Sequence, residues 1–223
     1  IVYRISSPGG SPVASETIAS LIHHARTQNV PVIVSMGDYA ASGGYWVSVE
    51  GTKIFAEPFT LTGSIGVFTG KFVLKDLWEK IGINWEGPSF GLNSGLASPN
   101  KAFTPEEWSR VSASLERIYS AFVNKVAHAR KLSPEAAEKA AKGRVWTGEQ
   151  AQSLGLVDQL GGLHDAIIAA RKESGLPEEA PTVIYPRKKP FLEALMDKLM
   201  GSHTDEHEAV EVGFETPYKY WKA

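Results

Sequence analysis

The chain has 223 residues, 43% of them apolar and 22% charged, so it is long enough to bury one sizeable core and too apolar for disorder. Its formal net charge of −2 leaves no basic field, which argues against nucleic acid as a partner. The absence of cysteine excludes disulfides, thiolate zinc sites and a cysteine nucleophile. No set of histidines or carboxylates has the spacing of metal ligands, and no cofactor is expected.

Predicted strands and helices alternate along the first part of the chain. Runs of β-branched residues predict the strands, and apolar residues at helical spacing predict the helices between them. Repeated units of this kind specify a mostly parallel α/β sheet flanked by helices, with the carboxyl ends of its strands at one edge. The predicted strands span residues 1–5, 30–37, 52–56 and 60–70, and the predicted helices span 13–28, a short segment after Ser42, and 72–82.

The first predicted helix has a clear start signal. Ser11 followed by Pro12 is typical of an N-cap and the first helical position. The apolar residues that recur at helical spacing are expected to form its buried face, and they are Ile18, Leu21, Ile22 and Ala25.

The second half is predicted to be mainly helical. Thr104-Pro105-Glu106-Glu107 combines an N-cap, a proline and a capping-box glutamate at the start of a long helix to about Arg130. Further helices are expected from Ser133-Pro134, from Thr147 and from Leu163, with a brief strand before the last. We expect residues 1–175 to form the main domain.

Residues 176–223 are expected to be an extension that is partly helical or mobile. The segment 181–186 has the residue types of one last strand. An apolar stripe over 190–200 predicts a helix docked on a protein surface, with a helix lying on a membrane surface as the alternative. The polar residues from Ser202 onward predict no fixed structure.

Three glycine-rich turns follow predicted strands, and one of them carries Ser42. In a parallel sheet these turns meet at the same edge. A serine hydroxyl becomes a nucleophile when a base takes its proton and backbone N–H groups receive the oxyanion, and glycines present such N–H groups without a Cβ in the way. A purely structural role as turns is the alternative, and Ala40 breaks the G-x-S-x-G pattern. The turns are Pro8-Gly9-Gly10, Ser42-Gly43-Gly44 and Gly63-Ser64-Ile65-Gly66.

Four motifs together resemble the signal peptide peptidase A family, the bacterial protease IV group of serine–lysine peptidases. The resemblance covers roughly residues 1–171 and implies a Clp-protease/crotonase-like fold. It implies that Ser42 is the nucleophile, that Ser64 orients a lysine base, and that Gly10 and Gly43 lie in the turns that form the oxyanion hole. The motifs are SSPGGSPVASETI, MGDYAASGGYWVS, LTGSIGVF and GRVWTGEQAQSLGLVDQLGG.

The lysine that the family needs is missing from its expected place. Short members carry it in a Ser-Gly-Lys loop, where this chain has Ser94-Gly95-Leu96. In long members an amino-terminal half contributes the lysine and the carboxyl-terminal half contributes the serine. The chain is therefore expected to be the carboxyl-terminal half of a long member, without its amino-terminal domain and inactive or weak alone. The lysines near this loop are expected to lie on the surface, and they are Lys71, Lys75, Lys80 and Lys101.

The resemblance also implies what the protein acts on and where. The expected substrates are hydrophobic remnants of signal peptides, cleaved inside a homo-oligomer on the periplasmic side of the bacterial inner membrane. The expected membrane anchor lies outside this chain. Two other hypotheses remain, a crotonase-type acyl-CoA hydratase or isomerase and a non-catalytic assembly domain. The apolar residues near Ser42 are expected to pack in the core or line substrate subsites, and they are Tyr45, Trp46, Ile65, Val67 and Phe68.

Overall fold

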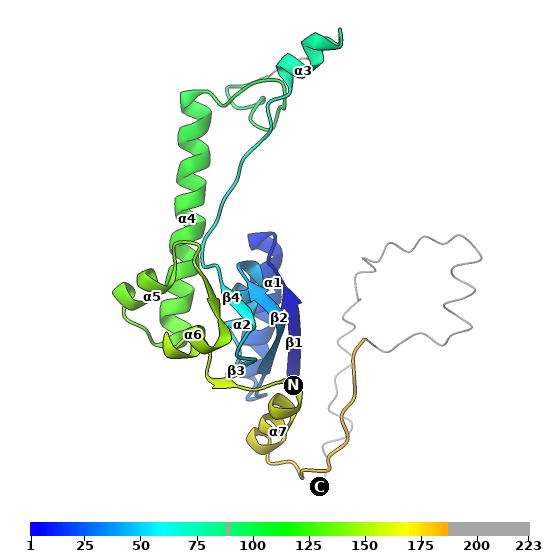
Figure 1. Ribbon diagram of the computed structural model, residues 1–223, viewed down its shortest axis with the longest axis vertical. Helices are drawn as coiled ribbons and strands as arrows, with labels where there is room; N and C mark the ends of the chain where they lie inside the picture. The colour runs from blue at the N-terminus through cyan, green and yellow to red at the C-terminus, as the bar shows by residue number, and fades with distance from the viewer. Residues whose placement is uncertain (88–89, 187–223) are drawn as a thin grey trace, which may run out of the picture. The chain divides into compact units, whose positions relative to one another are not determined.

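The computed structural model describes residues 1–87 and 90–186. The chain divides into two compact units, Ile1–Glu178 and Glu179–Ala223, and all the described strands and helices belong to the first (Figure 1). The strands are β1 (Val2–Ser7), β2 (Ile33–Ala41), β3 (Lys53–Ala56), β4 (Leu61–Gly63), β5 (Val145–Thr147) and β6 (Gln159–Leu160). The helices are α1 (Pro12–Thr27), α2 (Gly43–Ser48), α3 (Lys75–Lys80), α4 (Pro105–Arg130), α5 (Pro134–Ala140), α6 (Gly148–Ser153) and α7 (Leu163–Glu173).

The sheet is built around β2, and the predicted α/β class with a mostly parallel sheet is confirmed. Strand β2 pairs in parallel with β1, β3 and β4, and β3 pairs in parallel with β6. Strand β5 pairs antiparallel with β4. The first residues of β2, Ile33 to Gly37, are buried without alternation because both faces of the sheet are covered. Strand β2 is longer at its end than predicted, since β4 pairs with residues 39–41.

Helix α1 begins as predicted but packs through a different face. The Ser11 side chain accepts a hydrogen bond from the Ala14 N–H, so the predicted N-cap is confirmed. The buried residues are Ser15, Ala19 and Ile22, whereas Ile18 and Leu21 are 39% and 46% exposed. The predicted apolar face was therefore wrong for these two residues, because small side chains allow α1 to approach α2 closely.

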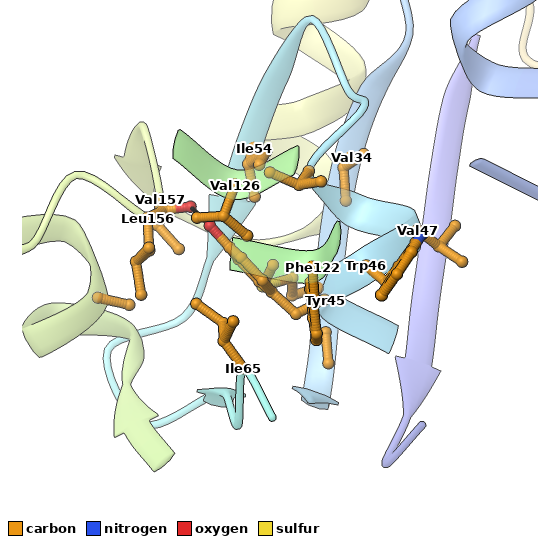
Figure 2. Packing of buried hydrophobic residues seen from close by; sticks show 14 of the residues in the cluster. Val34, Tyr45, Trp46, Val47, Ile54, Ile65, Phe122, Val126, Leu156 and Val157 are labelled. Carbon is orange, nitrogen blue, oxygen red and sulfur yellow. Dashed lines mark hydrogen bonds between the residues drawn. The ribbon is translucent and has the colours of Figure 1, made fainter. Parts of the chain in front are cut away.

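The hydrophobic core joins α2 to the sheet and to the second half of α4. Figure 2 shows the buried side chains of this cluster, which include Tyr45, Trp46, Phe122 and Val126. The rings of Trp46 and Phe122 lie 4.6 Å apart between their centroids. The hydroxyl of Tyr45 donates a hydrogen bond to the Leu156 carbonyl at 2.9 Å, and burial raises the pKa of this tyrosine. The core therefore fixes the helix that directly follows Ser42.

Residues 66–104, which we call the arm, have a different character. None of the described residues between Ile65 and Glu107 is buried. The predicted strand at 60–70 is reduced to β4, since Gly63 and Ser64 both have positive φ and end it. The predicted helix at 72–82 is the six-residue α3, which has no buried residue. In Figure 1 helix α4 begins well beyond the sheet, next to the arm, and runs back to the sheet.

Segment 181–186 is not a strand, contrary to the prediction. A strand needs a partner for its N–H and C=O groups, and no described strand pairs with this segment. Val183, Ile184 and Tyr185 are exposed instead. The helix predicted at 190–200 and the tail from Ser202 lie outside the described residues, and both stay predictions.

Candidate active site

The three glycine-rich turns line one cleft of about 660 Å³ at the carboxyl edge of the parallel strands. The turns follow β1, β2 and β4, as expected for strands that run in the same direction. Ser42, Ser64, Gly10 and Gly43 all contribute to the lining of this cleft. The structure therefore brings together the residues that the sequence singled out. The remaining lining residues are Pro8, Gly9, Pro12, Trp46, Gly66, Val67, Phe68, Ile118, Tyr119, Phe122, Lys142 and Gly143.

Ser42 occupies the junction between β2 and α2 in a strained backbone conformation. Its φ of 53° and ψ of −121° belong to a region that residues with a Cβ rarely adopt. Two backbone hydrogen bonds hold it there, from the Ser42 N–H to the Gly63 carbonyl and from the Trp46 N–H to the Ser42 carbonyl, each 2.9 Å long. The side chain does not cap α2. A strained serine on a strand-to-helix turn is the arrangement that exposes the nucleophilic hydroxyl in α/β-hydrolases.

The glycines around Ser42 are required by close packing of the turns. A Cβ on Gly9 would lie 2.7 Å from both the Gly43 nitrogen and the Ser42 Cβ. A Cβ on Gly43 would lie 2.5 Å from the Ser15 Oγ, and a Cβ on Gly44 would lie 2.5 Å from the Ser7 carbonyl oxygen. The sequence has glycines here because the end of β1 and the start of α1 pass directly over the serine turn.

The same packing leaves N–H groups beside the serine without protein partners. Within residues 1–87 and 90–186, the N–H groups of Gly10 and Gly43 donate to no other backbone or side-chain group. Gly43 is the first residue of α2, where helix N–H groups have no partner inside the helix. N–H groups of this kind, next to a serine hydroxyl, can donate the hydrogen bonds that stabilise an oxyanion.

Ser64 lies on the neighbouring turn and has a φ of 48°. Its N–H donates to the Arg144 carbonyl at 2.7 Å, and the Gly143 N–H donates to the Ile65 carbonyl at 2.9 Å. These bonds fix residues 142–144 against the Ser64 turn. As a result Lys142 enters the cleft lining, a position that the sequence analysis missed. Its place directly before the GRVWTG motif was the available signal.

The lysines of the arm do not line the cleft. The Lys71 ammonium donates to the Leu96 carbonyl at 3.1 Å and lies 4.2 Å from the centroid of the Phe103 ring. Lys101 pairs with the buried carboxylate of Glu107 at 2.9 Å, and Lys75 pairs with Glu79 at 3.6 Å. None of these lysines is therefore placed to take a proton from Ser42.

The apolar residues near Ser42 separate into two groups. Tyr45 and Ile65 are fully buried in the core, so they line no subsite. Trp46, Val67 and Phe68 do line the cleft, and Phe68 is 95% exposed. The lining of the cleft thus includes apolar side chains as well as the serine turn.

No group of three or more histidine, aspartate or glutamate side chains in residues 1–87 and 90–186 is arranged to hold a metal ion. Over the same residues, no helix has the length and apolar character needed to cross a bilayer.

This chain forms a class of domain in which an α/β sheet carries a strained serine at the edge where its glycine turns meet. The sequence pattern of peptidase family S49 matches residues 24–177. The chain belongs to this family, which confirms the resemblance drawn from the motifs. It is a peptidase-family domain.

Curated relatives of this chain are named as proteases. It is 43% identical to protease 4 of Salmonella typhi over 91% of this chain and 32% of the relative. It is 40% identical to the chloroplastic serine protease SPPA of Arabidopsis thaliana over 90% of this chain and 29% of the relative. A putative protease of Synechocystis is 35% identical, over 87% of this chain and 70% of that protein. The chain thus spans about a third of the length of the first two relatives.

Among solved structures, the chain is similar to a mutant of ClpP1 from Listeria monocytogenes. The TM-score is 0.49 and the sequence identity is 18%, over 74% of this chain and 75% of that one.

Proposed function

We propose that this chain is the nucleophile-bearing domain of a serine endopeptidase, with Ser42 as the nucleophile. The observation that carries the proposal is the strained conformation of Ser42 in a cleft that also contains Gly10, Gly43 and Ser64. Strain of this kind costs about 1 to 3 kcal/mol and persists where the surrounding structure enforces it, commonly at active sites. Membership of a peptidase family and the names of the relatives support the same function.

In the proposed reaction the Ser42 hydroxyl attacks the carbonyl carbon of a peptide bond while a neutral amine takes its proton. The oxyanion is stabilised by the N–H groups of Gly10 and Gly43, which have no partners within the described residues. The amine then gives the proton to the leaving nitrogen, and an ester to Ser42 remains. Water hydrolyses this ester with the amine again as base, which regenerates the serine.

We propose that the base is a lysine supplied by an amino-terminal domain of the same protein. Lysine has an ordinary pKa of about 10.4, and base catalysis near neutral pH needs roughly 7 to 8. A low value requires burial of the amine, and none of the arm lysines lines the cleft. The Salmonella and Arabidopsis relatives are about three times as long as the match, which leaves room for such a domain. The role of Ser64 in this proposal is to orient the lysine.

The proposed substrates are hydrophobic remnants of signal peptides, and the proposed setting is a homo-oligomer at the periplasmic face of the bacterial inner membrane. Two observations support this part. The cleft walls are apolar, as an apolar peptide requires. The arm exposes large apolar side chains, including Phe72, Phe90 and Leu92, that a neighbouring subunit or domain would cover. The membrane anchor in this proposal lies outside the chain.

The test joins this chain to the upstream half of a full-length homologue and measures two signals. The first is covalent labelling by a fluorophosphonate probe, and the second is cleavage of a signal peptide. We expect Ser42→Ala to abolish labelling and to lower turnover by about 10⁴-fold or more. Ser20→Ala is the matched control, because Ser20 lies on the exposed surface of α1 and should change neither signal. Turnover that survives Ser42→Ala would exclude the proposal.

A further inference from the structure

The candidate cleft contains one charged residue. Of the described residues that line it, only Lys142 carries a formal charge, while the others are glycines, prolines, serines, and apolar or aromatic residues. A single cation in an otherwise neutral and largely apolar cleft favours one kind of ligand, because an anion complements its charge. An anion on an apolar molecule would satisfy both parts of the cleft.

Lys142 is held at this position by the backbone. It follows the end of α5 with a φ of 60°, and Gly143 continues the turn with a φ of 69°. The Gly143 N–H bonds to the Ile65 carbonyl, and a Cβ on Gly66 would lie 3.0 Å from the Gly143 Cα. The lysine is therefore anchored directly beside the turn that carries Ser64. Its place in the cleft depends on this turn and not on a flexible loop.

A carboxylate lies near the ammonium group of Lys142, but it does not use all of the ammonium's hydrogen-bond donors. Its described partner is the Glu138 carboxylate, with 3.6 Å between Nζ and Oε1, which is longer than the 2.7 to 2.9 Å of a charge-assisted hydrogen bond. The other oxygen of Glu138 accepts a hydrogen bond from the Tyr119 hydroxyl at 2.9 Å, which fixes the carboxylate. An ammonium has three donors. The Lys142 side chain is 59% exposed, so its ammonium is open to solvent.

We propose that Lys142 binds a carboxylate of the peptide that occupies the cleft. The inference rests on the proposed function, since it assigns a substrate feature to the same site. Apolar peptides with a free carboxyl terminus, or with an acidic side chain at the matching position, carry this carboxylate. The apolar walls bind the side chains, and Lys142 sets the register of the peptide relative to Ser42.

The test measures binding and does not depend on turnover. Fluorescein-labelled peptides rich in leucine and alanine are titrated with the full chain carrying Ser42→Ala, and the fluorescence anisotropy is recorded. The peptide with a free carboxyl terminus is compared with its carboxyl-terminal amide, and amidated peptides with an internal glutamate are compared with those with glutamine. We expect the carboxylate to strengthen binding about 3- to 5-fold, which is the effect of an exposed ion pair. This gain should shrink in high salt.

Variants separate the lysine from general electrostatics. Lys142→Met should make acid and amide bind equally, and Lys142→Arg should retain the difference. Glu138→Gln should increase the preference for the acid, because it removes the competing carboxylate. Lys139→Met is the matched control, since Lys139 lies on α5 next to Glu138 but does not line the cleft.

Two outcomes overturn the inference, and they are distinguishable. If peptides bind but neither carboxylate matters, or if the preference survives Lys142→Met, the carboxylate site is wrong while the proposed function stands. If no apolar peptide binds in either form, the peptide-binding part of the proposed function fails with it.

Discussion

The sheet with its glycine turns is closely packed, whereas the arm is not. Around β2 every turn is packed so closely that glycines are the residues that fit, and the core side chains are buried. In the arm, no described residue between Ile65 and Glu107 is buried, and several aromatic side chains face solvent. The match to the peptidase family covers the arm and the part of the sheet from β2 onward, whereas β1 and the Gly9 turn precede it. The glycine turns therefore depend on close packing within the described chain, whereas the arm leaves large apolar side chains exposed to solvent.

A pair of phenylalanines gives the largest expected difference between the two regions. Phe122 is 1% exposed and packs against Trp46, whereas Phe72 in the arm is 85% exposed. We expect Phe122→Ala to lower the free energy of unfolding by about 3 to 5 kcal/mol, because it leaves a cavity. Phe72→Ala should change it by about 0.5 kcal/mol or less. Urea denaturation of both variants measures the difference. Equal losses of unfolding free energy would show that the two regions do not differ in packing.

Glycines allow the same test for the backbone. Gly44 lies in α2, where alanine ordinarily stabilises a helix, but its added Cβ would lie 2.5 Å from the Ser7 carbonyl oxygen. We expect Gly44→Ala to cost about 2 kcal/mol as an overpacked contact. Gly70 in the arm has no atom within 4 Å of the added Cβ, so Gly70→Ala should be neutral or slightly stabilising. Thermal unfolding of the two variants decides between these expectations, and a neutral Gly44→Ala would contradict the described packing.

Strain at Ser42 predicts a change of opposite sign. Glycine adopts a φ of 53° and a ψ of −121° without the penalty that a Cβ imposes. Ser42→Gly should therefore unfold at a higher temperature than Ser42→Ala, by the equivalent of about 1 kcal/mol, although both variants lack the serine hydroxyl. Differential scanning fluorimetry provides the measurement. A Ser42→Ala variant that is as stable as Ser42→Gly would mean that the serine backbone is not strained.

The smallest expected effect concerns pH. Burial raises the pKa of Glu50, but hydrogen bonds and charge from Lys125 and His23 outweigh it and hold this pKa below its ordinary value. Its carboxylate also lies 3.9 Å from Arg26, and Lys125 also contacts Glu16. A lowered pKa stabilises the fold above the unfolded pKa of about 4.5, and this stabilisation is lost as the pH falls through the folded pKa.

Lys125→Met should remove part of this pH dependence, on the order of 0.5 to 1 kcal/mol. Urea denaturation at pH 6 and at successively lower pH measures it. The control is Glu79→Gln in the arm, whose exposed pair with Lys75 should contribute no measurable pH dependence. An unchanged pH profile in Lys125→Met would show that the pair with Glu50 does not stabilise the fold.

Much of the fold was predictable from local patterns. The caps at Ser11, Thr104 and Thr147 are confirmed, because capping depends on residues three positions apart. The mostly parallel sheet followed from the alternation of strands and helices. The wrong face of α1 and the absent strand at 181–186 had a common cause, since both depended on which distant element packs against the segment.

The sequence by itself determined the family, the motifs and the position of Ser42, because these are properties of residue types at fixed spacing. The alternation of strands and helices also predicted that the three glycine turns meet at one edge of the sheet. Only the tertiary structure decided that this edge forms a cleft, that Ser42 is strained, and that Lys142 lines the cleft beside Ser64. Residues 42, 64 and 142 are far apart along the chain, so no local pattern relates them. Their proximity results from strand pairing, which buries β2 and brings its neighbours' turns to one edge.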